Sequence, residues 1–190
     1  MEITNYMTRL QNSRGFTLME ILISVGILAT VGILIVQVMF TTTNVNTKSV
    51  LLADIKQNGE FAMDVMSRQI RGAATIETTC GIEDTTTSSV TIRTLENATT
   101  TFLCHSDGIA ARIASMDAQA NISYVTGNSV TLSASGLATC DDSTLSFSCL
   151  FAIGITQPVT IQFTLRQPGT GTGIYDVSQR SFTNTVNVRN

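Results

Sequence analysis

The chain has 190 residues, of which 43% are hydrophobic and 13% are charged, and its net charge at pH 7 is −3. Once a leader and one long helix are set aside, about 120 residues remain, enough for one globular domain with a modest core. Lys48 and Lys56 are the only lysines. The sequence therefore lacks the clustered basic surface that nucleic-acid capture requires, and no nucleic-acid partner is expected.

Residues 16–40 form an apolar stretch with a single charge, Glu20. As a helix this stretch would be roughly 37 Å long, enough to cross a hydrocarbon core of about 30 Å. Arg9 and Arg14 precede it, whereas residues 41–47 are uncharged, so the positive-inside rule places the N-terminus in the cytoplasm. The run is longer than the core of a cleaved secretory signal. We expect a retained single-pass span in contact with membrane lipid, with residues 73–190 outside.

The acid at Glu20 needs an explanation, because a carboxylate in a span costs about 2.5–3.5 kcal/mol at the bilayer centre and less near an end. One explanation is a signal anchor whose glutamate reaches back to the interface. The other comes from the residues around it. The run from Arg14 to Glu20, RGFTLME, followed by an apolar segment, closely resembles the class III signal of type IV prepilins and pseudopilins.

This resemblance implies a processing site and a set of partners. In that family a prepilin peptidase cuts after the glycine and methylates the new first residue, which here would be Gly15 and Phe16, so residues 1–15 would be a cleaved leader. The family's glutamate corresponds to Glu20 and would pair with the N-terminal amine of a neighbouring subunit. The implied partners are the prepilin peptidase, other pilin or pseudopilin subunits and an inner-membrane assembly platform.

Helical spacing continues beyond the span and predicts one helix over residues 16–72. Apolar or small residues recur every three or four positions, at Leu52, Ile55, Gly59, Ala62, Met66 and Ile70, which is typical of an amphipathic helix. Arg68 and Arg71 suit a last turn, and Gly72 suits the position after it. Asn58-Gly59 is a turn signal inside this pattern and leaves room for a local bend.

Residues 58–62, Asn-Gly-Glu-Phe-Ala, and residues 67–73, Ser-Arg-Gln-Ile-Arg-Gly-Ala, give a second resemblance. They resemble the equivalent helix of minor pilins of the PilW type and of type II secretion pseudopilins of the J type. Residues 16–71 contain no proline, whereas many major type IVa pilins carry a helix-kinking proline in the span. The minor-pilin or pseudopilin side of the family is therefore favoured.

Residues 73–190 change to a composition rich in Thr, Ser and Val and predict a β-rich head outside the membrane. The clearest strands are residues 159–166 and 182–189, where apolar and polar residues alternate. Hairpins are predicted from residues 89–94 with 101–104 and from residues 123–125 with 130–133; weaker strands are residues 109–113 and 145–147. The fold class is α+β, a long N-terminal helix packed on an antiparallel sheet.

Four cysteines lie in the head: Cys80, Cys104, Cys140 and Cys149. Outside the cytoplasm an even count predicts two disulfides, with three connectivities open. We predict the sequential pairs Cys80–Cys104 and Cys140–Cys149, because each closes a local loop. The alternative is a metal site with His105, but no C-x-x-C pair is present, so no metal is expected.

Catalytic groups are scarce, since the chain has one histidine and no tryptophan. His105, Ser106 and Asp107 are sequence neighbours, whereas triad partners normally converge from separate segments. Asp107 and Asp141-Asp142 could offer oxygen to calcium but lack the alternating spacing of a calcium loop. We expect no catalytic residues, no enzyme activity and no cofactor.

The sequence as a whole predicts a minor pilin or pseudopilin that is stored in the cytoplasmic membrane and then built into a thin filament. The alternative is a single-pass, membrane-anchored binding domain outside the membrane that does not polymerise. The residues do not distinguish a pilus from a type II secretion system or a DNA-uptake machine.

Overall fold

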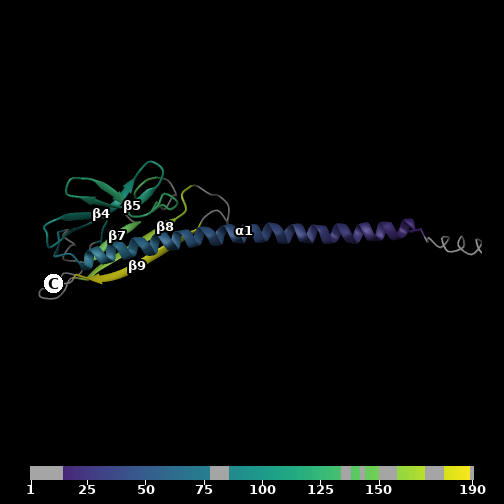
Figure 1. Ribbon diagram of the computed structural model, residues 1–190, viewed down its shortest axis with the longest axis horizontal. Helices are drawn as coiled ribbons and strands as arrows, with labels where there is room; N and C mark the ends of the chain where they lie inside the picture. The colour runs from purple at the N-terminus through teal and green to yellow at the C-terminus, as the bar shows by residue number, and fades with distance from the viewer. Residues whose placement is uncertain are drawn as a thin grey trace, which may run out of the picture. The chain divides into compact units, whose positions relative to one another are not determined.

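The computed structural model describes residues 15–77, 86–133, 138–141, 144–149, 158–169 and 178–188 (Figure 1). Within these residues one helix, α1 (Leu18–Arg71), precedes nine strands. The chain divides into two compact units, Met1–Val45 and Asn46–Asn190. The first unit therefore holds the apolar part of α1, and the second holds the remainder of α1 with all the strands.

The ends of α1 follow their local signals. The helix begins two residues later than predicted because Thr17 caps it: the Thr17 hydroxyl oxygen accepts a hydrogen bond from the backbone N–H of Glu20 at 3.2 Å. At the other end Arg68 and Arg71 occupy the last turn, and the N–H of Gly72 donates to the Arg68 carbonyl at 3.1 Å. The predicted stop near Gly72 is confirmed.

The local bend considered at Asn58-Gly59 does not occur, because α1 is one uninterrupted helix. The Asn58 side chain donates to the carbonyl oxygen of Asp54 one turn earlier, at 3.0 Å, and so supports the helix instead of a turn. Gly59 is buried against the head. The glycine is therefore a packing feature of the helix.

Two antiparallel sheets make up the head, where the sequence had predicted one. The first has the order β1-β3-β4-β5-β6 and the second the order β2-β7-β8-β9. The strands are β1 (Thr75–Ile76), β2 (Thr86–Thr87), β3 (Val90–Arg93), β4 (Thr99–Ser106), β5 (Ala111–Asp117), β6 (Ile122–Tyr124), β7 (Leu145–Cys149), β8 (Pro158–Arg166) and β9 (Gln179–Asn187). Figure 1 shows the larger strands beside the C-terminal half of α1.

The first predicted hairpin and the two clearest strands are confirmed. Strands β3 and β4 pair antiparallel from Val90↔Phe102 to Arg93↔Thr99, and Asn97 in the connecting turn has a φ of 65°, a left-handed conformation that asparagine tolerates better than most residues. Strands β8 and β9 pair along their whole length. Both apolar faces point inward, as their alternation predicted.

The second predicted hairpin, residues 123–125 with 130–133, is wrong. Strand β6 pairs with β5 instead. The side chain of Thr131 explains why the later segment does not fold back on β6, because its hydroxyl oxygen accepts from the N–H of Ala111 on β5 at 3.1 Å. The backbone of Thr131 bridges Arg166 on β8. Residues 130–133 thus connect the two sheets.

The core of the second unit lies between α1 and both sheets. One stripe of the helix is buried, formed by Ile55, Gly59, Ala62, Met66, Ser67 and Ile70. Phe102 of the first sheet and Phe147 and Phe163 of the second are the largest fully buried side chains. The helix stripe and the inward faces of the strands therefore share a single apolar cluster.

The predicted sequential disulfides are wrong, because Cys104 is bonded to Cys140. The chain before β7 passes the end of β4, where the Ser106 hydroxyl donates to the Ala138 carbonyl, and this brings the two sulfurs together. Cys140 precedes β7 and Cys149 ends it, so the extended strand, at about 3.3 Å per residue, holds these two apart. Cys149 is also disulfide-bonded, and Cys80 lies outside the described residues.

Candidate assembly site

The predicted processing residues lie at the start of the described chain. Gly15, Phe16 and Thr17 precede the first turn of α1 and are exposed. A Cβ added to Gly15 would meet nothing within 4 Å, and the Phe16 side chain is 77% exposed. Nothing in the described part of the chain therefore blocks a peptidase from the bond between Gly15 and Phe16.

Glu20 lies at the third position of α1. It is the only acid in the first turn, where the unpaired N–H groups of the helix end favour a negative charge. The spacing from Thr17 to Glu20 is that of a capping box, in which a threonine caps the helix and a glutamate follows three residues later. Glu20 is exposed, and among the described residues its carboxylate makes no ion pair.

The first half of α1 is apolar on every side. It contains an 18-residue stretch with a mean hydropathy of 2.6 that buries none of its residues in the structure. Its few hydroxyls bond to the helix itself: Ser24 donates to the Glu20 carbonyl at 2.7 Å, and Thr30 donates to the Ile27 carbonyl at 2.8 Å. A helix that satisfies its own polar groups in this way is compatible with a single-pass membrane anchor.

Asn58 and Gly59 fix the second half of α1 to the head. A Cβ added to Gly59 would lie 2.1 Å from Cζ of Phe182 on β9, so only glycine leaves room for this ring, which also stacks on Phe163 at a centroid distance of 5.2 Å. Next to it, the side-chain oxygen of Asn58 accepts from the N–H of Gly127 at 2.9 Å. Asn58-Gly59 therefore sets where the helix docks.

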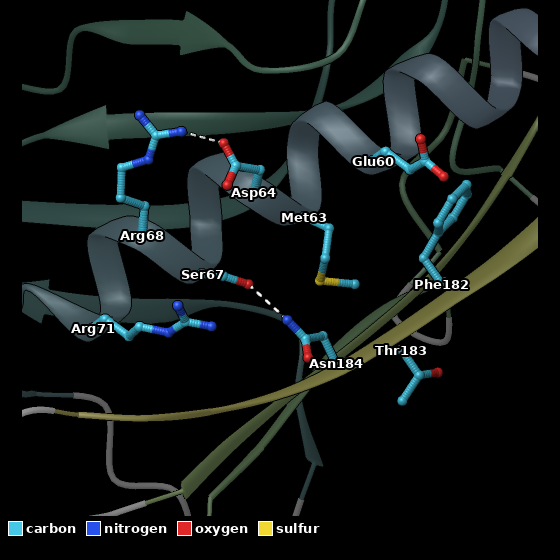
Figure 2. A pocket seen from close by; sticks show the side chains of 9 residues that line it. All are labelled: Glu60, Met63, Asp64, Ser67, Arg68, Arg71, Phe182, Thr183 and Asn184. Carbon is cyan, nitrogen blue, oxygen red and sulfur yellow. Dashed lines mark hydrogen bonds and ion pairs between the residues drawn. The ribbon is translucent and has the colours of Figure 1, made fainter.

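A groove of about 440 Å³ lies between α1 and β9, with Met63 and Phe182 as its largest apolar side chains (Figure 2). One hydrogen bond crosses it, from the Asn184 side-chain nitrogen to the Ser67 hydroxyl at 3.0 Å. Its helix wall is the stripe Glu60, Met63, Asp64, Ser67, Arg68 and Arg71. This groove was not anticipated from the sequence, because Ser67 and Asn184 lie 117 residues apart in the chain.

The charges along the groove are unevenly paired. Arg68 forms an ion pair with Asp64, and Lys56 lies 3.7 Å from Glu60. Arg71 makes no ion pair among the described residues. The groove therefore carries an acid toward one end, at Glu60, and a cation at the other, at Arg71.

Comparison of this chain with protein-family models, with curated proteins and with solved structures found no match.

The neighbouring residues His105, Ser106 and Asp107 bond to three different groups. Nδ1 of His105 lies 2.9 Å from the Tyr124 hydroxyl, and Ser106 bonds to Ala138. Asp107 accepts hydrogen bonds from the backbone N–H groups of Ala110 and Ile109 and pairs with Arg112, which together lower the pKa of its carboxyl. These side chains do not converge on a common point.

The candidate metal ligands are likewise dispersed. In the described part of the chain no group of three or more His, Cys, Asp and Glu residues lies together. Cys104 is occupied by its disulfide to Cys140, and Asp107 by protein donors. Asp142 of the calcium alternative lies outside the described residues.

Proposed function

We propose that this chain is a structural subunit of a type IV pilus-like filament, a minor pilin or pseudopilin. Prepilin peptidase would process it at Gly15, and it would assemble through the apolar half of α1. The observation that carries the proposal is the start of that helix, where the prepilin-like motif from Arg14 to Glu20 leads directly into an exposed surface that is apolar on all sides.

The apolar surface supports two successive environments. Before assembly, the helix would lie in the cytoplasmic membrane as a single-pass anchor, with the head outside. In the filament, the same side chains would pack against the helices of neighbouring subunits. Both environments are dry, and the first half of α1 is suited to them because its hydroxyls donate to its own backbone carbonyls.

The role of Glu20 follows from the charge that processing creates. Cleavage leaves an amine on Phe16 with an ordinary pKa of about 7.7–8.0, and hence a cation at neutral pH. An unpaired charge inside an apolar bundle costs several kcal/mol. The carboxylate of Glu20 has no ion-pair partner in the described chain, so it is available to pair with the amine of a neighbouring subunit and offset that cost.

The test is incorporation into filaments when the variant is the only copy of the chain. Glu20→Ala should insert and fold its head normally but should be recovered in sheared filaments at roughly a tenth of the wild-type level or less, a loss that corresponds to about 1.4 kcal/mol or more. Glu20→Asp should be intermediate because its carboxylate is shorter. Glu96→Ala, which removes an exposed acid from a turn of the head, is the matched control and should assemble normally.

Equal recovery of wild type and Glu20→Ala would contradict this role. If wild type itself never enters filaments, the membrane-anchored binding domain becomes the better account. Head folding, measured by circular dichroism of the full chain in detergent, must be unchanged in each variant for either conclusion.

A further inference from the structure

The outer edge of β9 and the groove beside it form an interaction surface that the proposed function leaves without a partner. Strand β9 is the last strand of its sheet, and among the described residues no segment pairs with its outer side. We propose that this edge receives an extended segment of a different protein chain as an additional strand. The inference rests on the proposed function in one respect, since it assumes that all subunits share one membrane and one filament polarity.

The hydrogen-bonding pattern shows which backbone groups are free. The N–H of Thr164 on β8 donates to the carbonyl oxygen of Thr144, on the β7 side of the sheet. Because backbone groups alternate along a strand, those of Phe163 point the other way and bond to its partner Phe182 on β9. The outward N–H and C=O groups on β9 are consequently those of Ser181, Thr183 and Thr185.

This edge lacks the features by which proteins usually block strand addition. Protective edges are short, bulged or interrupted by proline or lysine. Strand β9 has nine residues in unbroken register with β8 and contains neither proline nor lysine. Its one charge, Arg180, lies near its start with its guanidinium 5.8 Å from the centroid of the Phe182 ring. The edge is therefore long, regular and open.

The groove specifies the chemistry of the incoming strand (Figure 2). Glu60 and Arg71 are separated by about 16 Å along the helix, and the first and third of three alternate residues in an extended strand are about 13 Å apart, so long basic and acidic side chains can reach both ends. Alternate side chains of an added strand would face Glu60, then Met63 with Phe182, then Arg71. The complementary segment is one with a basic, an apolar and an acidic residue at alternate positions.

A second copy of this chain does not fit the surface. Gly59 meets Phe182, and Ser67 meets Asn184, so α1 and β9 run in the same direction. Antiparallel pairing of two β9 edges would make the two helices antiparallel, which a shared membrane forbids. Parallel pairing would turn the sheet of the second copy over, because the two-fold axis then runs along the strands. Only the uncharged side chains of the second copy's Ser181, Thr183 and Thr185 would then face the charged groove. None of the described strands of this chain carries a basic, an apolar and an acidic residue at alternate positions, so the fitting occupant is a strand from a different chain.

The first experiment uses synthetic peptides with the full chain in detergent micelles. The mixed-charge probe has the sequence TVTKTVTETVT, and the comparison probe, TVTKTVTKTVT, carries two lysines. Wild type should bind the mixed probe about tenfold more tightly, and the probe should slow hydrogen exchange at the Ser181, Thr183 and Thr185 amides. In Arg71→Glu the preference should change to the dilysine probe.

A matched pair of variants tests the edge itself. Thr183→Pro removes an outward N–H and should leave the ladder with β8 intact, because an edge strand tolerates proline at such a position. It should abolish probe binding, whereas Thr183→Ala should bind as wild type does. Equal binding by the two variants, or binding without protection of the three amides, would overturn the inference. An unchanged unfolding temperature of Thr183→Pro confirms that its sheet is intact.

The second experiment identifies the occupant in filaments. A photo-reactive residue in place of Thr183 should cross-link to a peptide of another subunit, whereas the same residue in place of Gln162, exposed on β8, should not. Cross-links to peptides of this chain, or filaments that contain this chain without a Thr183 cross-link, would overturn the inference and leave the proposed function intact. Failure of wild type to enter filaments would instead contradict the proposed function, and the peptide result would still decide whether the edge accepts a strand.

Discussion

The two halves of α1 use the same kinds of residue in opposite ways. In the first half apolar side chains surround the helix, and Ile33 is 61% exposed. In the second half they form one stripe against the head, and Ile70 is fully buried. An apolar surface on all sides requires a partner outside the chain, whereas a single stripe is covered by the chain's own sheets. Under the proposed function, assembly and folding therefore use different parts of one helix.

The same substitution in the two halves should have different consequences. Ile70→Ala should lower the free energy of unfolding of the head by about 2–5 kcal/mol, because it leaves a cavity in a packed core. Ile33→Ala should leave head unfolding unchanged. Thermal unfolding of the full chain in detergent measures both. A similar loss of stability in Ile33→Ala would break the comparison.

Removal of the Cys104–Cys140 bridge should affect only the stability of the head. The two cysteines are 36 residues apart, and closing such a loop is worth about 3–4 kcal/mol in the chain-entropy model. Cys104→Ala with Cys140→Ala should destabilise the head by that order and leave membrane insertion unchanged. Peptide mapping without reduction should also link Cys149 to Cys80, the one remaining cysteine; a Cys140–Cys149 peptide would refute the pairing.

Glycine-to-alanine substitutions offer a finer test. Gly59→Ala should destabilise the head by about 1–3 kcal/mol, since its Cβ overlaps the Phe182 ring and the ring must shift. Gly26→Ala meets nothing within 4 Å and should leave head unfolding unchanged. If Gly59→Ala unfolds at the wild-type temperature, the close approach of β9 to the helix is not what fixes the head.

The smallest expected effect is a pH dependence confined to the head. The pKa of Asp117 is lowered by hydrogen bonds from the side chain and backbone N–H of Asn121, and that of Asp107 by the N–H groups of Ala110 and Ile109. A lowered folded-state pKa contributes stability that is present above about pH 4 and lost as the pH falls through the folded value. Asp117→Asn and Asp107→Asn should therefore unfold at lower temperature than wild type at pH 7.

The difference from wild type should shrink as the pH falls through the folded-state pKa values of these two carboxyls, because the wild-type side chains then lose their charge as well. Thermal unfolding across this pH range measures it. A difference that persists unchanged at low pH would show that the carboxylate charge is not responsible.

Local patterns predicted most of the elements correctly. The helix followed from three- and four-residue spacing, with Arg68, Arg71 and Gly72 marking its end, and β8 and β9 followed from alternation. The hairpin around Asn97 followed from turn chemistry. In each case the signal lies within a few residues of the element that it specifies.

The errors arose where distant segments meet. The two sheets are joined at Thr131, whose side chain bonds to β5 and whose backbone bridges β8. Cys104 meets Cys140 because the chain before β7 passes the end of β4. The groove forms where Ser67 meets Asn184, which lies 117 residues later in the sequence. No local pattern encodes such meetings, although Gly59 was already unusual within a helical pattern.

Under the proposed function the chain is processed at Gly15 and then retained by its apolar helix. Intact mass of the membrane-bound protein should show the loss of Met1–Gly15 and a mass increase of one methyl group on Phe16. A mature protein that keeps its leader, or one that begins beyond Val36, would contradict it.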